Sequence, residues 1–172
     1  MATCTGDTKT LGPITLCTEA GARPWTPTVR QLRLMSRLVT SPVSIRIVHR
    51  RDVGRFWPAS VPVSAGPYAF RAFTRRNRIV AFVDATETQA SLAWLLLHEL
   101  AHTLVNSDTA LLRRFRSQPK PPGYPVSDDQ HAAWPEEKFA NDFADRCAAS
   151  LGVSAGLDRH WWRARVARRD LL

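Results

Sequence analysis

The sequence predicts an α+β domain in which a short, mostly antiparallel sheet of three strands packs against helices. Three runs of alternating or β-branched residues supply the strand candidates, at residues 43–49, 68–74 and 79–84. Segments with helical periodicity precede and follow these runs. The third run is apolar on both faces, so we expect other elements to cover it on both sides.

Capping residues and prolines mark where the helices begin. Thr26 followed by Pro27 predicts the start of a first helix, which ends before Pro42. Thr86 and Gln89 have the spacing of a capping box for a second, strongly apolar helix. After this apolar helix we expect a short helix and then a long loop. A helix that begins at Pro135 and a basic terminal helix should follow the loop.

The length and the cysteines bound the domain organisation and the compartment. A chain of 172 residues is long enough for one domain with its own core, and we expect that domain over residues 26–172, after a loose N-terminal arm at residues 1–25. The apolar stretches are too short to span a membrane, and no secretory signal is apparent. Cys4, Cys17 and Cys147 are an odd, scattered set, which favours reduced thiols in the cytoplasm.

Arginine carries almost all of the formal net charge of +9. Such a surplus attracts polyanions in general, so it does not identify a partner by itself. The segment 159–169 mixes arginines with Trp161 and Trp162, as some nucleic-acid binders do. We interpret it as a terminal helix that docks its tryptophans and exposes its arginines, which makes nucleic acid a less favoured partner.

The stretch SLAWLLLHELAHTLV, residues 91–105, places His98, Glu99 and His102 in an otherwise apolar helix. Buried ionisable groups cost free energy unless something satisfies them. The two histidines are four residues apart on one helix face, so both imidazoles can bind one Zn²⁺. Glu99 can then take a proton from a zinc-bound water and pass it to a leaving amine. This is the H-E-x-x-H pattern of zinc peptidases; the less favoured alternative is two histidines satisfied by hydrogen bonds.

A catalytic zinc needs a third protein ligand and an open position for water. The downstream candidates are histidines and carboxylates, namely His131, Glu136, Glu137, Asp142 and His160. The residue types alone leave these alternatives open.

The segment EKFANDFA, residues 137–144, resembles the second motif, E-x-x-A-N-x-F-A, of the ImmA/IrrE family of zinc metallopeptidases. The matching positions are Glu137, Ala140, Asn141, Phe143 and Ala144. The resemblance implies a zincin-like fold and a gluzincin-like site in which Glu137 is the third ligand. It also implies that Asn141 hydrogen-bonds a ligating histidine and that the two alanines let this helix pack closely on the zinc helix.

The other ligand candidates are weaker beside that motif. Glu136 would point about 100° around the helix from the motif glutamate, and Asp142 would lie off the metal face for the same reason. We interpret His160 as a surface residue of the last helix. The chain departs from the family where DRCAASLGV follows the second motif, in place of an apolar run ending in Met-Pro.

A peptidase must also stabilise an oxyanion and hold its substrate. Tyr124 and His131 are candidate oxyanion donors, and His131 is also the alternative ligand. The strand at 79–84 can present an edge to an extended peptide, although its apolar faces are equally explained as core, which is the favoured interpretation.

The resemblance implies a zinc-dependent metalloendopeptidase acting on a protein. By analogy, that protein would be a transcriptional repressor cut at one site in phage or mobile-element regulation. Two other classes stay open: a zinc-binding regulatory module without turnover, and a DNA-associated protein that uses its arginine surface.

Overall fold

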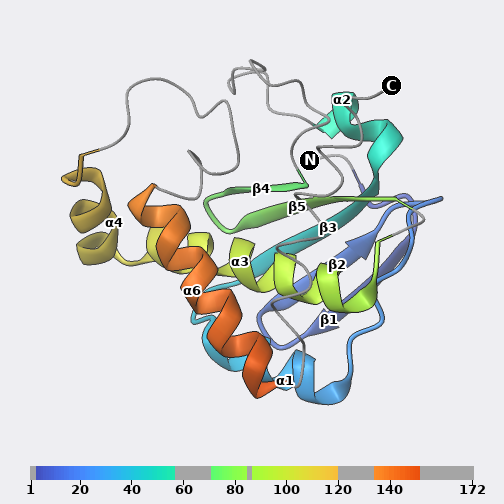
Figure 1. Cartoon of the computed structure of the whole chain (residues 1–172). Helices are drawn as coiled ribbons and strands as arrows, with labels where there is room; N and C mark the ends of the chain where they lie inside the picture. The colour runs from blue at the N-terminus through green and yellow to red at the C-terminus, as the bar shows by residue number, and fades with distance from the viewer. Residues whose placement is uncertain (1–2, 57–70, 85–86, 120–133, 152–172) are drawn as a thin grey trace, which may run out of the picture.

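The computed structural model describes residues 3–56, 71–84, 87–119 and 134–151, which form five helices, a short 3₁₀ turn and a five-stranded mixed sheet (Figure 1). The strands are β1 (Asp7–Leu11), β2 (Ile14–Thr18), β3 (Val43–His49), β4 (Ala72–Arg75) and β5 (Arg78–Val83). The helices are α1 (Val29–Leu38), α2 (Val53–Phe56), α3 (Gln89–Ser107), α4 (Thr109–Arg116) and α6 (Pro135–Ser150), with the 3₁₀ turn η1 (Arg50–Asp52) before α2.

The strand order across the sheet is β1-β2-β3-β5-β4. β1 with β2 and β4 with β5 are antiparallel pairs, whereas β3 is parallel to both β2 and β5. The predicted α+β class is confirmed, but the prediction of three mostly antiparallel strands is wrong. The chain reaches the outer strand β4 before it returns through β5, so β3 and β5 run in the same direction. β5 is therefore an inner strand, so the less favoured interpretation of residues 79–84 as a substrate edge is wrong.

The segment expected to be a loose N-terminal arm contains the hairpin of β1 and β2. Its turn has Gly12 at φ +54°, a left-handed conformation that glycine adopts without steric cost. Every residue of β1 is exposed, so the strand carries no apolar period and is held by its backbone pairing with β2. Periodicity could not reveal such a strand.

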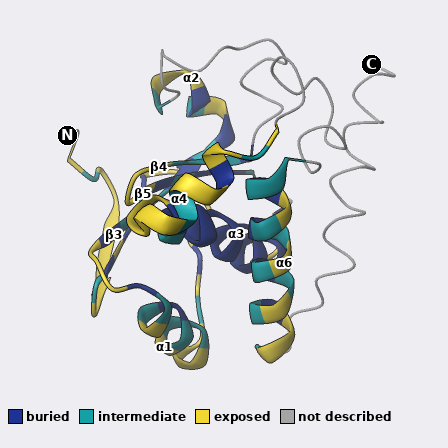
Figure 2. Ribbon diagram, turned by 90° about the vertical axis from the view of Figure 1, so that its left-hand side faces the viewer, coloured by how far each residue is buried: buried dark blue, intermediate teal, exposed yellow. Residues whose placement is uncertain are grey.

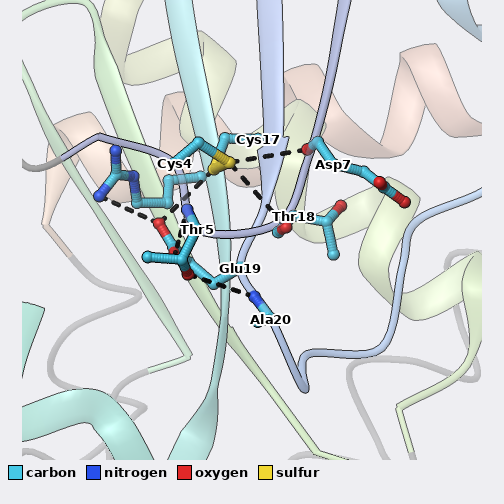
Figure 3. The surroundings of a disulfide bond; sticks show 8 residues. Cys4, Thr5, Asp7, Cys17, Thr18, Glu19 and Ala20 are labelled. Atoms are coloured by element: carbon cyan, nitrogen blue, oxygen red, sulfur yellow. Dashed lines mark hydrogen bonds and ion pairs between the residues drawn. A yellow bond between two sulfur atoms is a disulfide. The ribbon is translucent and has the colours of Figure 1, made fainter.

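A disulfide joins Cys4 to Cys17 across this hairpin (Figure 3). The expectation of three reduced thiols is wrong for this pair, and Cys147 is the free cysteine. Strand pairing, which places Thr8 opposite Cys17, brings the two cysteines together, and their spacing in the sequence gives no sign of it.

The buried carboxylate of Glu19 ties the start of the chain to the middle of the sheet. It forms an ion pair with Arg46 of β3 at 3.1 Å and accepts a hydrogen bond from the backbone N–H of Thr5 at 3.2 Å (Figure 3). The N-terminal segment is therefore part of the domain.

α3 packs between the sheet and α6, and this arrangement defines the main core (Figures 1 and 2). Ile79, Ala81 and Val83 of β5 face this core, while Phe82 packs on the other face in a smaller cluster with Val48 and Val53. The expectation that this strand is covered on both sides is confirmed. Within the described ranges, no helix is long and apolar enough to cross a bilayer.

Two helices begin two residues later than expected. Thr28, and not Thr26, caps α1, in a capping box with Gln31. Thr88 caps α3, because its hydroxyl accepts a hydrogen bond from the backbone N–H of Ser91 at 3.0 Å. The side chain of Gln89 instead accepts a hydrogen bond from the backbone N–H of Thr26 at 2.8 Å. These two residues were both expected to cap helices, but they link the segment before α1 to the start of α3. The expected proline start of α6 is confirmed.

Small residues on α6 allow its close approach to α3. Ala140, Ala144 and Ala148 recur every fourth position and are fully buried, as the motif implied for the first two. A larger side chain at any of them would have to displace the packed core.

We predict that Ala144→Leu lowers the free energy of unfolding by about 1–3 kcal/mol, because it overpacks this interface. Ala149 is exposed on the same helix, and Ala149→Leu should change the stability by less than about 0.5 kcal/mol. Urea unfolding followed by circular dichroism measures both. Equal stabilities of the two variants would contradict close packing of α6 on α3.

Candidate metal centre

α3 carries three ionisable side chains through the middle of the domain. Every residue from Ser91 to Thr103 is buried, because the sheet covers one side of the helix and α6 the other (Figure 2). His98, Glu99 and His102 are each at most 9% exposed. Their polar atoms must therefore be satisfied by neighbouring groups or by a bound ion.

Glu137, in the first turn of α6, completes a cluster with the two histidines. The Nε2 atoms of His98 and His102 are 3.2 Å apart. The Glu137 carboxylate lies 3.2 Å from Nε2 of His98 through one oxygen and 3.4 Å from Nε2 of His102 through the other. Three potential ligand atoms thus converge on one buried point from two helices.

The second nitrogen of each imidazole faces an oxygen acceptor on α6. Nδ1 of His98 lies 3.0 Å from Oδ1 of Asn141, and Nδ1 of His102 lies 3.0 Å from a carboxylate oxygen of Glu136. Such acceptors favour the tautomer with its proton on Nδ1, which leaves the Nε2 lone pair directed at the cluster. Trp94 stacks on the His98 ring at 5.5 Å and restricts its orientation.

The cluster fits a tetrahedral metal ion. Zinc–nitrogen bonds of about 2.0–2.1 Å place neighbouring donor atoms of a tetrahedron about 3.3 Å apart. The two imidazole nitrogens are 3.2 Å apart, and one oxygen of the Glu137 carboxylate lies 3.2 Å from the first nitrogen while its other oxygen lies 3.4 Å from the second. Two imidazoles and one carboxylate are also a donor set that zinc accepts, with a fourth position left for water or substrate. A second group of possible ligands, Cys4, Cys17 and Glu19, fits poorly because its sulfurs form the disulfide.

Glu99 lies beside the cluster and is held by the outer strand. The hydroxyl of Thr74, in β4, donates a hydrogen bond to one carboxylate oxygen of Glu99 at 2.6 Å. This bond fixes one side of the carboxylate and leaves its other oxygen for a second partner.

The structure brings together most of the side chains expected at the site. His98, His102, Glu137 and Asn141 meet as expected, and Glu99 is close enough for its charge to act on His102. Three other candidates, Tyr124, His131 and His160, lie outside the described residues. Asp142 is exposed on α6, in agreement with the expectation that it lies off the metal face.

Two contacts at the site were missed from the sequence. Glu136 was expected to point away, yet its carboxylate reaches His102, because a long side chain in the first turn of α6 can extend toward α3. Two consecutive glutamates at that helix start were the available signal. Thr74 had no local signal, since it belongs to a strand far away in the sequence.

His102 and Glu137 each favour the charged form of the other. Burial opposes a charge on His102, but the hydrogen bonds with Glu136 and Glu137 outweigh it and hold the pKa of the imidazole well above its usual value of 6.5. Burial likewise opposes a charge on Glu137, and the neighbouring histidines, His102 first, hold the pKa of this carboxyl well below its usual value of 4.5. A positive charge at the centre therefore stabilises the buried carboxylate.

Comparisons with models of known protein families, with curated proteins and with solved structures found no match. The resemblance to the ImmA/IrrE family therefore stays a prediction, and the site is interpreted from its own geometry.

We predict that the chelator-treated protein loses stability as the pH rises above 6.5. The pKa of His102 is raised in the folded protein, so its contribution to the free energy of unfolding is complete below pH 6.5 and is lost as the pH rises through the raised pKa. The pKa of Glu137 is lowered, so its contribution is present above pH 4.5. Thermal unfolding against pH measures the effect, and His102→Asn should flatten the decline. A stability that rises with pH above 6.5 would contradict the raised pKa of His102.

We predict that Glu136→Ala weakens zinc binding about 10–100-fold, because it removes the acceptor that orients His102. Competition with a chromogenic chelator measures the affinity. Asp142→Ala, an exposed change on the same helix, is the matched control and should leave the affinity unchanged. Equal affinities for the two variants would show that Glu136 does not orient the ligand.

Proposed function

We propose that this protein is a zinc-dependent peptidase that hydrolyses peptide bonds of a protein substrate. The observation that carries the proposal is the convergence of His98, His102 and Glu137 within 3.2–3.4 Å of one another, with Glu99 next to them on α3. The H-E-x-x-H pattern and the resemblance of residues 137–144 to the second family motif support it.

The three ligands would hold the zinc, and Glu99 would handle the protons. Bound zinc supplies a Lewis acid for the substrate carbonyl and lowers the pKa of the attacking water. A carboxylate oxygen of Glu99 would accept a proton from the attacking water as the oxygen of the water bonds to the carbonyl carbon. Glu99 then gives the proton to the departing nitrogen as the carbon–nitrogen bond breaks, which yields one carboxylate and one amine product.

Thr74 would position Glu99 for both proton transfers. Its hydroxyl donates to one carboxylate oxygen, which would leave the other oxygen for the water. A fixed carboxylate needs less rearrangement when the water attacks, and such orientation lowers the barrier.

The outer edge of β4 is the surface best placed to bind an extended substrate. The backbone N–H of Phe82 donates to the carbonyl oxygen of Arg71 at 2.7 Å, and hydrogen-bonded pairs alternate with open ones along an antiparallel ladder. Ala72 and Thr74 therefore direct their backbone groups away from β5. A peptide paired with them would lie directly beside Glu99.

By analogy with the family it resembles, the substrate would be a regulatory protein, such as a transcriptional repressor of a phage or mobile element. Nucleic acid stays a less favoured partner.

We predict that the wild type and Glu99→Gln each hold about one zinc per chain, whereas His98→Ala and Glu137→Ala lose it. His131→Ala should keep the metal. Elemental analysis of the dialysed proteins measures this. Zinc lost in His131→Ala and kept in Glu137→Ala would overturn the ligand set.

Turnover separates a peptidase from a zinc-binding module. Glu99→Gln should reduce cleavage of a proteome-derived peptide mixture about 10²–10⁴-fold, because it removes the proton acceptor while the metal stays bound. Mass spectrometry of the new peptide ends measures cleavage. Equal cleavage by the wild type and Glu99→Gln, or none by either, would contradict the proposed activity.

A further inference from the structure

The hairpin turn between β4 and β5 carries three exposed arginines. Arg75 and Arg78 lie directly opposite each other in the ladder, and Arg76 occupies the turn between them. The turn is anchored to the start of β3, because the side-chain amide of Asn77 donates a hydrogen bond to the carbonyl oxygen of Pro42 at 2.7 Å. The three charges are therefore held on a fixed backbone.

This arrangement is unfavourable for the isolated domain. Arg76 has φ +57°, the left-handed region that two-residue hairpin turns usually fill with glycine. Like charges directly opposite on paired strands also repel. Within the described ranges, no ion pair joins any of the three arginines to a carboxylate. Strain of this kind is retained where a neighbouring function needs it.

The turn lies next to the proposed catalytic carboxylate. Thr74, whose hydroxyl reaches Glu99 at 2.6 Å, directly precedes Arg75. Successive side chains of a strand alternate between faces, so Arg75 lies on the face opposite the one that carries Thr74. A substrate strand paired with β4 would place every second side chain on that same face.

We propose that the arginine turn binds acidic residues of the substrate, close to one side of the bond that is cleaved. The inference rests on the proposed function and names its substrate class, a protein segment with aspartate or glutamate near the cleavage site. Arg75 directly follows Thr74 and strands advance about 3.3 Å per residue, so we expect the acidic positions within a few residues of the cleaved bond.

Binding to a protein that cannot turn over tests this directly. Zinc-loaded Glu99→Gln is titrated with three fluorescein-labelled peptides of identical length and apolar centre. One carries two glutamates in its N-terminal half, one carries them in its C-terminal half, and one carries glutamines at all these positions. One acidic peptide should bind about 5–10-fold more tightly than the glutamine peptide, because each exposed ion pair contributes a factor of a few.

The combined variant Arg75→Ala, Arg76→Gly and Arg78→Ala, in the Glu99→Gln background, should reduce this preference to about 2-fold or less. The matched control removes three exposed positive charges at the other edge of the sheet, through Lys9→Ala in β1 and Arg33→Ala and Arg37→Ala in α1. It should keep the full preference. A preference that survives in the turn variant would overturn the inference. A preference that falls equally in both variants would also overturn it and would assign the effect to net charge. The turn arginines would then serve only to protect an exposed sheet edge.

Arg76→Gly alone gives a second, independent readout. Glycine relieves the left-handed strain, so the melting temperature should rise by about 2–4 °C while the preference for the acidic peptide falls. A rise in stability with an unchanged preference would exclude Arg76 from recognition. If the preference depends on the turn but the wild type cleaves no peptide, the binding surface stands and the peptidase proposal fails, so the two failures are distinguishable.

Discussion

The convergence of two imidazole nitrogens and a carboxylate at one buried point is the constraint on which the rest of this structure depends. A buried carboxylate is costly unless a positive charge lies beside it, and two imidazoles that share one centre cannot both be satisfied by each other. A cation at that point resolves both conflicts. Glu136 and Glu137 hold the pKa of His102 well above its usual value, so a protonated His102 offsets part of the same cost.

Much of the surrounding architecture serves to hold these donors within about 3.4 Å of one another. The buried alanines of α6 bring its backbone close to α3, so that Glu137 in the first turn reaches the histidines. Asn141 and Glu136 then fix the two rings from the same helix. The N-terminal end of α3 is fixed by a buried network in which Arg71 contacts both Glu87 and Ser91. The outer strand completes the site through Thr74, so the sheet edge and the metal helix are parts of one unit.

The sequence allowed the site to be predicted further than the fold. His98, Glu99 and His102 lie on one long apolar helix, and helical geometry alone puts both histidines on one face. Glu137 and Asn141 were identified through a motif, because no local rule says which later carboxylate returns to the helix. Thr74 and the histidine contact of Glu136 depend on how separate elements pack, and periodicity carries no information about that. The strand β1 was missed for a similar reason: its side chains are exposed, and only its pairing with β2 and the disulfide from Cys4 hold it.

We propose that the two histidines of α3 and Glu137 of α6 hold the metal. X-ray absorption spectroscopy of the zinc-loaded protein at the zinc edge tests it most directly. We expect a four-coordinate zinc with two imidazoles and two oxygen ligands at about 2.0–2.1 Å and no sulfur. Sulfur at about 2.3 Å would place the metal at Cys4 and Cys17 instead, and a shell of oxygen atoms without imidazole would contradict the site altogether.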